Sequence, residues 1–173
     1  RVVKKYKDLW LTHDVSGLPD QSISAIGALD DSVIVTSADV DLQKVHKTFI
    51  NNVLNVSTNI KGVSPIFHPD YIEAFKHVLK SGGQIDLIVS SEVLQKALMS
   101  KDAAEIQPYI ADQKLRVYLN EDLKFSLTVT ENCLSLGLFN LSGMYDYLSD
   151  LQCKTSEGIE WGTQLFYKIY AQS

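Results

Sequence analysis

The segment Leu123–Phe139 reads LKFSLTVTENCLSLGLF and contains two runs of alternating residues around a polar turn. From Lys124 to Thr130 polar and apolar side chains alternate, and a period of two places the two sets on opposite faces of a strand. Glu131-Asn132 makes the turn. The returning run places leucines on one face and mostly small or polar residues on the other, namely Cys133, Ser135, Gly137 and Phe139. The segment therefore predicts a β-hairpin whose small and polar face lines a groove.

A unit of strand, helix and strand precedes this hairpin. Ile60–Ser64 and Ile85–Val89 are short apolar runs, and between them Pro69 begins a helix that Ser81-Gly82-Gly83 ends. This order predicts a parallel strand pair with a right-handed crossover. The remaining expected elements are helices starting near Ser91 and near Asp102, a strand at Leu115–Leu119, a short edge strand at Met144–Leu148 and a helix over Ser156–Tyr170. We expect Ser91 to cap the first of these helices, and Asp102 with Glu105 to form a capping box on the second.

The N-terminal part of the chain is mainly helical in pattern. Its expected elements are helices at Val2–Leu11 and Pro19–Ile26, a short strand at Ser32–Thr36 and an amphipathic helix over Asp41–Val56. We predict one structural domain over residues 1–173, in which a helical segment, 1–58, packs on an α/β core, 59–173. The predicted fold class is α/β, with a mixed parallel and antiparallel sheet flanked by helices and preceded by the helical segment.

Composition narrows the class of protein. With 173 residues, 45% of them hydrophobic and 21% charged, the chain matches one globular domain, and no run reaches the roughly 18 apolar residues of a membrane span. A net charge of -5 argues against a nucleic-acid-binding surface. Two cysteines, Cys133 in a strand and Cys153 in a loop, need no disulfide framework and fit a reducing cytoplasm. Because the chain starts with Arg1 and carries no signal segment, we expect a cytoplasmic piece of a longer protein.

Several blocks, in order, resemble a known family. They are HDVSGLPDQSISAIGALDDSVIV from His13, GVSPIFHPDYIEAFKHVLKSGGQIDLIVSSEVL from Gly62, and LKFSLTVTENCLSLGLF, GMYDYLSDL and EWGTQLF from Leu123 onward. The chain resembles the non-DNA-binding domain of archaeal winged-helix transcription regulators, and more narrowly the methanogenesis regulatory protein family. The resemblance implies a C-terminal effector-sensing and dimerisation domain, a homodimer, and DNA contact only through a winged helix that this chain lacks. It also implies a core similar to one half of a phospholipase D fold.

That kinship raises the question of catalysis. Phospholipase D chemistry needs a histidine, a lysine two residues later and a following acid. Here Asp122 stands in the place of the histidine, Lys124 in that of the lysine and Val129 in that of the acid, so we predict no catalytic residues and no enzyme. His46 and His77 are expected to be solvated on helices. No CxxC, HExxH or phosphate-loop spacing occurs, so we expect neither a metal nor a cofactor.

We expect a small polar or anionic effector to bind beyond the carboxyl ends of the parallel strands and beside the hairpin. The predicted ligand-binding residues are Ser64, His68, Lys124, Ser126, Thr128, Tyr145 and Asp146. Each also has a structural reading: Ser64 as a turn residue, His68 as a helix cap, Lys124 as a solvated edge residue, Thr128 as an ordinary strand former, and Tyr145 and Asp146 as packing and turn residues. A purely structural interaction module without a small ligand is the main alternative, and a phosphohydrolase is a distant third.

Overall fold

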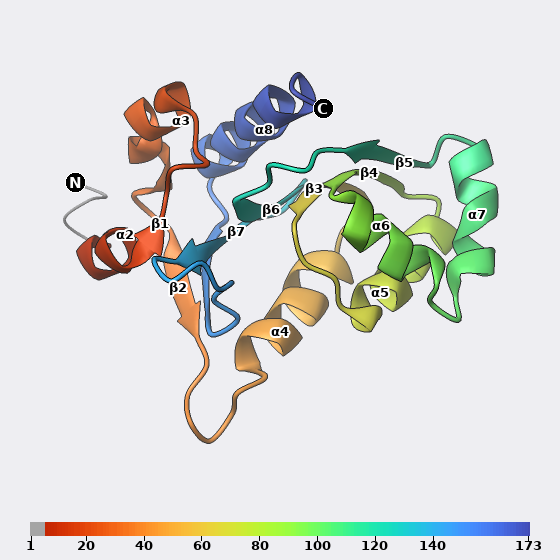
Figure 1. Cartoon of the computed structure of the whole chain (residues 1–173), viewed down its shortest axis with the longest axis horizontal. Helices are drawn as coiled ribbons and strands as arrows, with labels where there is room; N and C mark the ends of the chain where they lie inside the picture. Colours follow the sequence, from red (N-terminus) through yellow and green to blue (C-terminus); the bar gives the residue numbers. More distant parts are fainter. Residues whose placement is uncertain (1–5) are drawn as a thin grey trace.

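The centre of the molecule is one mixed β-sheet, seen in a computed structural model that describes residues 6–173 (Figure 1). The strands lie in the order β2-β8-β7-β6-β3-β4-β5, and β1 pairs with β7 beside this path. Their bounds are β1 His13–Asp14, β2 Val33–Thr36, β3 Asn59–Ser64, β4 Gln84–Val89, β5 Leu115–Leu119, β6 Phe125–Thr130, β7 Leu134–Asn140 and β8 Ser149–Cys153. The pairs β3–β4 and β4–β5 are parallel, and the other pairs are antiparallel. The predicted mixed sheet and its parallel strand-helix-strand unit are thus confirmed.

Helices cover both faces of this sheet. Their bounds are α2 Lys7–Thr12, α3 Asp20–Ser24, the 3-10 helix η1 Ile26–Leu29, α4 Lys44–Phe49, the π-helix η2 Ile50–Leu54, α5 Pro69–Lys80, α6 Ser91–Leu98, α7 Ala103–Ala111 and α8 Ser156–Tyr170. One apolar core lies between the sheet, η1 and α8, and a second lies between the sheet, η2, α5 and α7 (Figure 1). Burial of these two apolar layers supplies the main driving force for this arrangement.

The hairpin divides its side chains between the two layers. Phe125, Leu127 and Val129 pair with Leu138, Leu136 and Leu134 and are buried in the core beneath α8. On the other face, Ser126 pairs with Gly137, and Thr128 with Ser135. The predicted separation of an apolar face from a small, polar face is therefore confirmed, and the polar face lies on the side of α4 and α5.

Helix α5 begins and ends as its sequence predicts. The side chain of His68 accepts a hydrogen bond from the backbone N–H of Asp70 at the N-terminus, and Pro69 occupies the first turn. Beyond the C-terminus, Gly82 adopts a φ of 85°, which residues with a side chain rarely adopt. These two features fix where α5 begins and ends in the connection from β3 to β4.

Helix α8 lies unusually close to the sheet. A Cβ atom at Gly162 would collide with Leu134 and Val129, and one at Gly158 would collide with Cys153. Two glycines one turn apart thus allow the helix backbone to approach the sheet. Both cysteines are buried and free, and Cys153 belongs to β8 rather than to a loop.

The edge strand expected at Met144–Leu148 is reduced to one antiparallel bridge, between Tyr145 and Phe139 of β7. After Tyr145 the chain turns, and the carboxylate of Asp146 accepts the N–H of Leu148 at 2.9 Å. The last strand is β8 at Ser149–Cys153. Buried Asp150 and Gln152 interrupt the apolar pattern of β8, which hid the strand in the sequence.

The predicted helix over Asp41–Val56 is shorter and changes its winding. It begins at Lys44, because the Ser37 hydroxyl accepts the N–H of Val45 at 3.0 Å while Asp41 lies in a preceding turn. From Ile50 the backbone continues as a π-helix. The strand predicted at Ser32–Thr36 is confirmed as β2, which pairs with β8, so the N-terminal segment supplies a sheet strand as well as helices.

Two predicted helix caps were also wrong. Ser90, not Ser91, caps α6 through a hydrogen bond from the N–H of Val93. Asp102 makes no capping bond, because its carboxylate accepts from the Lys76 ammonium at 3.2 Å instead.

Of the helix expected at Val2–Leu11, residues 2–5 lie outside the described residues. Within residues 6–173, no helix combines the length and apolar character that crossing a bilayer requires.

Candidate functional site

Two cavities lie side by side on the sheet face that is covered by α4 and α5. They share Phe49, Tyr71 and Ser126 in their linings. One cavity, of about 90 Å³, is almost entirely apolar, and we call it the apolar cavity. The other, of about 250 Å³, is lined mainly by polar and aromatic side chains, and we call it the polar pocket.

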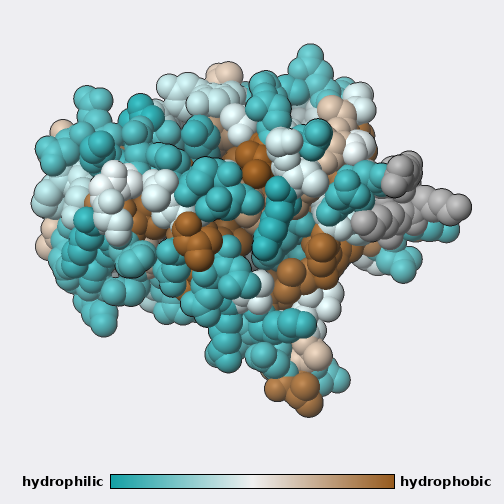
Figure 2. Space-filling view, turned by 180° about the vertical axis from the view of Figure 1, so that it is seen from behind, coloured by the Kyte–Doolittle hydropathy of each residue, from teal (hydrophilic) through white to brown (hydrophobic). Residues whose placement is uncertain are grey.

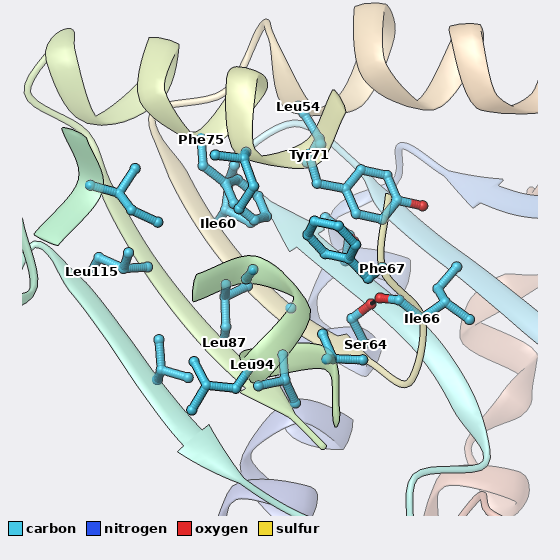
Figure 3. A pocket seen from close by; sticks show the side chains of 18 of the residues that line it. Leu54, Ile60, Ser64, Ile66, Phe67, Tyr71, Phe75, Leu87, Leu94 and Leu115 are labelled. Atoms are coloured by element: carbon cyan, nitrogen blue, oxygen red, sulfur yellow. Dashed lines mark hydrogen bonds between the residues drawn. The ribbon is translucent and has the colours of Figure 1, made fainter. Parts of the chain in front are cut away.

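The apolar cavity lies between the parallel strands and the helices over them. Figure 3 shows Ile60, Leu87 and Leu115 on the strands facing Phe75 on α5 and Leu94 on α6. Tyr71 and Phe67 lie at one end of the cavity, and Ser64 stands near them at the end of β3 (Figure 3). The hydroxyl of Ser64 donates to the carbonyl of Ile66 at 2.6 Å, so it also holds the turn after β3.

The polar pocket has a floor of strand residues and walls from three other segments. Ser126, Ser135 and Asp150 contribute from β6, β7 and β8. One wall is the turn at 145–147, and the opposite wall is formed by α4 and the start of α5. The complete set of lining residues is Leu42, Gln43, Val45, His46, Phe49, His68, Asp70, Tyr71, Ser126, Ser135, Tyr145, Asp146, Tyr147, Ser149 and Asp150.

Asp150 is the most unusual group in the polar pocket. Its side chain accepts hydrogen bonds from the Ser135 hydroxyl at 2.7 Å and from the Gln152 amide at 2.9 Å. Burial raises the pKa of Asp150 from 3.8 to about 6, although both hydrogen bonds act in the opposite direction. A carboxyl group kept in a buried site, where it is costly to ionise, is typical of functional sites.

Tyr145 points from its turn across the pocket floor. Gly137 makes this possible, because a Cβ atom there would coincide with the Tyr145 hydroxyl. Burial raises the pKa of Tyr145 well above its usual value, while a hydrogen bond with Ser126 acts in the opposite direction. The ring packs edge-on against Phe139 and Tyr147, with centroids 5.3 Å and 4.9 Å away. Tyr145 therefore offers an un-ionised hydroxyl in a fixed position.

Asp146 connects the pocket wall to the N-terminal segment. One of its carboxylate oxygens lies 2.8 Å from Nε2 of His13, whose Nδ1 lies 2.9 Å from the carbonyl oxygen of Leu9. His13 belongs to β1, which pairs with β7. A displacement of the turn at 145–147 would therefore also displace His13, near the N-terminal end of the described chain.

A group of two histidines and one aspartate lies at the edge of the polar pocket. Nε2 of His46, on α4, is 2.8 Å from a carboxylate oxygen of Asp70, on α5. His68 stacks beside His46, with ring centroids 4.0 Å apart. Burial and the neighbouring His46 lower the pKa of His68, while Asp70 acts to raise it. The hydrogen bond from His46, helped by the two nearby imidazoles, lowers the pKa of Asp70.

The structure brings six of the seven predicted site residues to these two cavities. Ser126 lines both, Ser64 and Thr128 line the apolar cavity, and His68, Tyr145 and Asp146 line the polar pocket. The remaining residue, Lys124, precedes β6, is exposed, and packs its Cβ beside Gly17, away from both linings. Asp122, in the place of the phospholipase D histidine, is exposed in the same loop.

Sequence reasoning missed Asp150, His46 and Asp70, and it placed Ser135 on the groove-lining face of the hairpin without naming it as a ligand-binding residue. His46 was expected to be solvated, but its side chain is only 25% exposed and lines the polar pocket. Asp150 carried a usable signal, because an acid in the middle of the run SDLQC interrupts an otherwise strand-like pattern. Nothing local in the sequence brings His46 next to His68.

Comparisons with known proteins agree with this fold. The family model described as "Methanogenesis regulatory protein FilR1, middle domain" matches residues 42–172. The methanogenesis regulatory protein FilR1 of Methanothrix harundinacea (strain 6Ac) is 29% identical over 169 residues, which are 95% of this chain and 37% of that protein. The chain therefore spans well under half the length of this relative. The family description calls the matched part a middle domain, whereas the resemblance implied a C-terminal domain.

Solved structures with little sequence identity share the fold. TrmBL2, described as an archaeal chromatin protein with a novel mode of DNA binding, aligns with a TM-score of 0.64 at 11% identity, over 82% of this chain and 52% of its own. NucT from Helicobacter pylori aligns at 0.58 with 15% identity, over 82% and 96%. The phospholipase D family member Nuc from Salmonella typhimurium aligns at 0.55 with 9% identity, over 82% and 95%. The predicted phospholipase D-like architecture is thus confirmed, and the chain belongs to the family of the methanogenesis regulatory protein FilR1 middle domain.

Proposed function

We propose that this domain is the ligand-sensing part of a transcription regulator and that its ligand binds in the polar pocket without being chemically changed. The observation that carries the proposal is Asp150, a carboxyl group held in a buried site together with Tyr145 and Ser135. Apolar residues of similar size would stabilise the sheet better at this position. Retaining a polar, partly open pocket there favours recognition of a molecule.

The lining of the pocket indicates the chemistry of the ligand. Asp70, Asp146 and Asp150 supply carboxyl groups, and Lys124, the cation expected from the sequence, lies outside. These groups suit a ligand that donates hydrogen bonds or carries positive charge better than an anion. Because the apolar cavity shares Tyr71 and Phe49 with the polar pocket, an apolar part of the same ligand fits beside its polar part.

Binding without catalysis is supported by the partners of the polar groups. The hydroxyl of Ser135 donates to Asp150, and Ser126 bonds to Tyr145, so these two serines of the pocket floor pair with groups other than a histidine base. Regulation would then follow from a higher ligand affinity in one arrangement of the protein than in another. The contact between Asp146 and His13 would transmit a shift of the turn at 145–147 from the pocket to the N-terminal segment.

A screen of small metabolites by thermal shift, followed by calorimetry on the hits, tests this proposal. A true ligand stabilises the protein in proportion to its concentration above Kd. We expect Tyr145→Phe and Asp150→Asn to weaken binding by about tenfold or more, as for loss of a buried hydrogen bond of roughly 1.5 kcal/mol. Lys124→Ala, outside both cavities, is the matched control. A ligand whose affinity depends on Lys124 and not on Tyr145 or Asp150 would overturn the assignment.

A second role, self-association, is supported by one apolar edge of the molecule. The loop between β2 and α4 protrudes from the body, and its tip is hydrophobic (Figures 1 and 2). In this loop Val40 is 97% exposed, and the adjoining turn exposes Leu141 and Met144. The two segments are joined by a hydrogen bond from the N–H of Ser37 to the carbonyl of Leu148. We propose that a second copy of the chain covers this edge, because apolar side chains gathered at one edge of a protein favour burial against another protein surface.

Sedimentation velocity over a range of concentrations tests the dimer. We expect the double variant Val40→Asp with Met144→Asp to shift the population toward monomer. Met99→Asp is the control, since Met99 is 85% exposed but lies after α6, away from this edge. Equal association of all three proteins would exclude this edge as the contact.

A further inference from the structure

His46, His68 and Asp70 form a cluster at the edge of the polar pocket, and recognition of the proposed ligand does not by itself explain why these three side chains meet. One potential ligand atom from each residue lies within 4.8 Å of the corresponding atoms of the other two. The residues come from two separate elements, since His46 lies in α4 and His68 and Asp70 lie at the start of α5. Tertiary folding, not local sequence, therefore brings the three together.

Existing contacts account for only part of this arrangement. Capping of α5 explains why His68 stands before Pro69, because its Nδ1 accepts the N–H of Asp70 at 3.1 Å. It does not explain why a second imidazole stacks on the first at 4.0 Å, beside an aromatic Tyr71 and facing a carboxylate. Two adjacent imidazoles repel each other when both are protonated. A metal ion bound by both rings would account for their proximity.

We propose that His46, His68 and Asp70 bind one divalent first-row transition-metal ion at the edge of the polar pocket. Two imidazole nitrogens and one carboxylate oxygen suit Zn²⁺, Co²⁺, Ni²⁺ or Fe²⁺ and leave coordination positions open. Mg²⁺ and Ca²⁺ prefer sets of oxygen ligands, of which this cluster has one residue. All three residues line the polar pocket, so the ion would lie at the edge of this pocket.

The metal would join α4 to α5. The two helices already meet through the contact of 2.8 Å from Nε2 of His46 to Asp70 and through the rings of Phe49 and Tyr71, whose centroids are 5.6 Å apart. A metal ion here would replace the hydrogen bond between His46 and Asp70 with stronger metal-ligand bonds. The positive end of the α5 dipole opposes the ion, and the carboxylate of Asp70 offsets this effect. The test of this site is separate from that of the proposed ligand, because metal binding is measured without any organic molecule.

Titration of the tag-free, chelator-treated chain with Co²⁺ and Zn²⁺ tests the site. We expect one ion per chain by calorimetry, and with Co²⁺ the visible absorption bands of an ion bound by imidazole. His46→Ala and His68→Ala should each weaken binding by more than the roughly 10- to 100-fold that loss of an outer-sphere partner costs. Asp70→Asn keeps the size of the side chain and should weaken binding with little effect on folding, as circular dichroism would show.

His77→Ala is the matched control, because His77 is exposed on the same helix and lies outside the cluster. It should bind Co²⁺ like the natural protein. Absence of saturable binding at millimolar Co²⁺ or Zn²⁺ would overturn the proposal. So would unchanged binding in the His46→Ala and His68→Ala variants, or an equal loss in His77→Ala.

Discussion

The hydroxyl of Tyr145 lies directly against the backbone of Gly137, in the space that any side chain at position 137 would occupy. This contact fixes how far the turn at 145–147 enters the polar pocket. It also ties the shape of the pocket to a single glycine in β7.

Replacing Gly137 with alanine should therefore expel Tyr145 from its position. We expect a loss of about 1–3 kcal/mol in the free energy of unfolding, as for other overpacked cores. The near-ultraviolet circular dichroism should change, since Tyr145 would leave Phe139 and Tyr147. Gly27→Ala is the control, because a Cβ there meets nothing within 4 Å. If Gly137→Ala kept the natural spectrum and stability, the packing described for Tyr145 would be wrong.

Asp150 should make stability depend on pH in a predictable direction. Its pKa is about 6 in the folded protein and near 3.8 when unfolded, so between these values the folded state binds more protons. The stabilisation is complete below about pH 4 and is lost as pH rises through 6, by about 2–3 kcal/mol in total. Asp150→Asn keeps an oxygen that accepts from Ser135 and Gln152 but removes the charge.

Urea unfolding at pH 4.5 and pH 8 measures this effect, with pH values chosen to bracket the titration. We expect Asp150→Asn to be more stable than the natural protein at pH 8 and to lose the dependence between the two conditions. Asp39→Asn, in an exposed loop, should behave like the natural protein. Identical pH dependence in all three proteins would mean that Asp150 ionises normally.

Gly162 should resist a substitution that usually helps helices. Alanine in a helix interior is favoured over glycine by about 1 kcal/mol. Here its methyl group would collide with Leu134 and Val129, and we expect the collision to prevail with a net loss of about 1–3 kcal/mol. Gln164→Ala, exposed on the same helix, should change stability by less than about 0.5 kcal/mol. A stabilised Gly162→Ala variant would show that α8 can move away from the sheet.

Lys76 should contribute to stability in a salt-dependent way. Its ammonium lies 3.1 Å from Glu73, 3.2 Å from Asp102 and 3.3 Å from Glu105, and so joins α5 to α7. Lys76→Met keeps the apolar stem but leaves the acidic groups without their cation, so Tm should fall at low salt and fall less at high salt. Lys96→Met, which breaks one exposed pair with Glu92, should leave Tm nearly unchanged. Equal effects of the two substitutions would exclude a special role for the Lys76 cluster.

The sequence predicted those elements whose pattern is local. Alternation identified β6 and β7, and Pro69 with Gly82 bounded α5, because strand periodicity and helix termini depend on neighbouring residues. Strand β8 was missed, since its buried Asp150 is stabilised by Ser135 from another strand. The polar pocket itself depends on tertiary contacts, such as that of Tyr145 with Gly137, which no single-chain periodicity encodes.

The position of β2 in the sheet has a consequence for the order of folding. Strand β2 lies at the sheet edge and pairs with β8, which is followed only by α8 in the described chain. Contacts between distant segments form late, because chain entropy opposes them until the intervening residues are ordered. Strand β1 can pair with β7 earlier, but β2 stays without its partner strand during synthesis until β8 has been made. A nascent chain halted before Ser149 would carry Val33–Thr36 as an unpaired strand, open to chaperones and proteases.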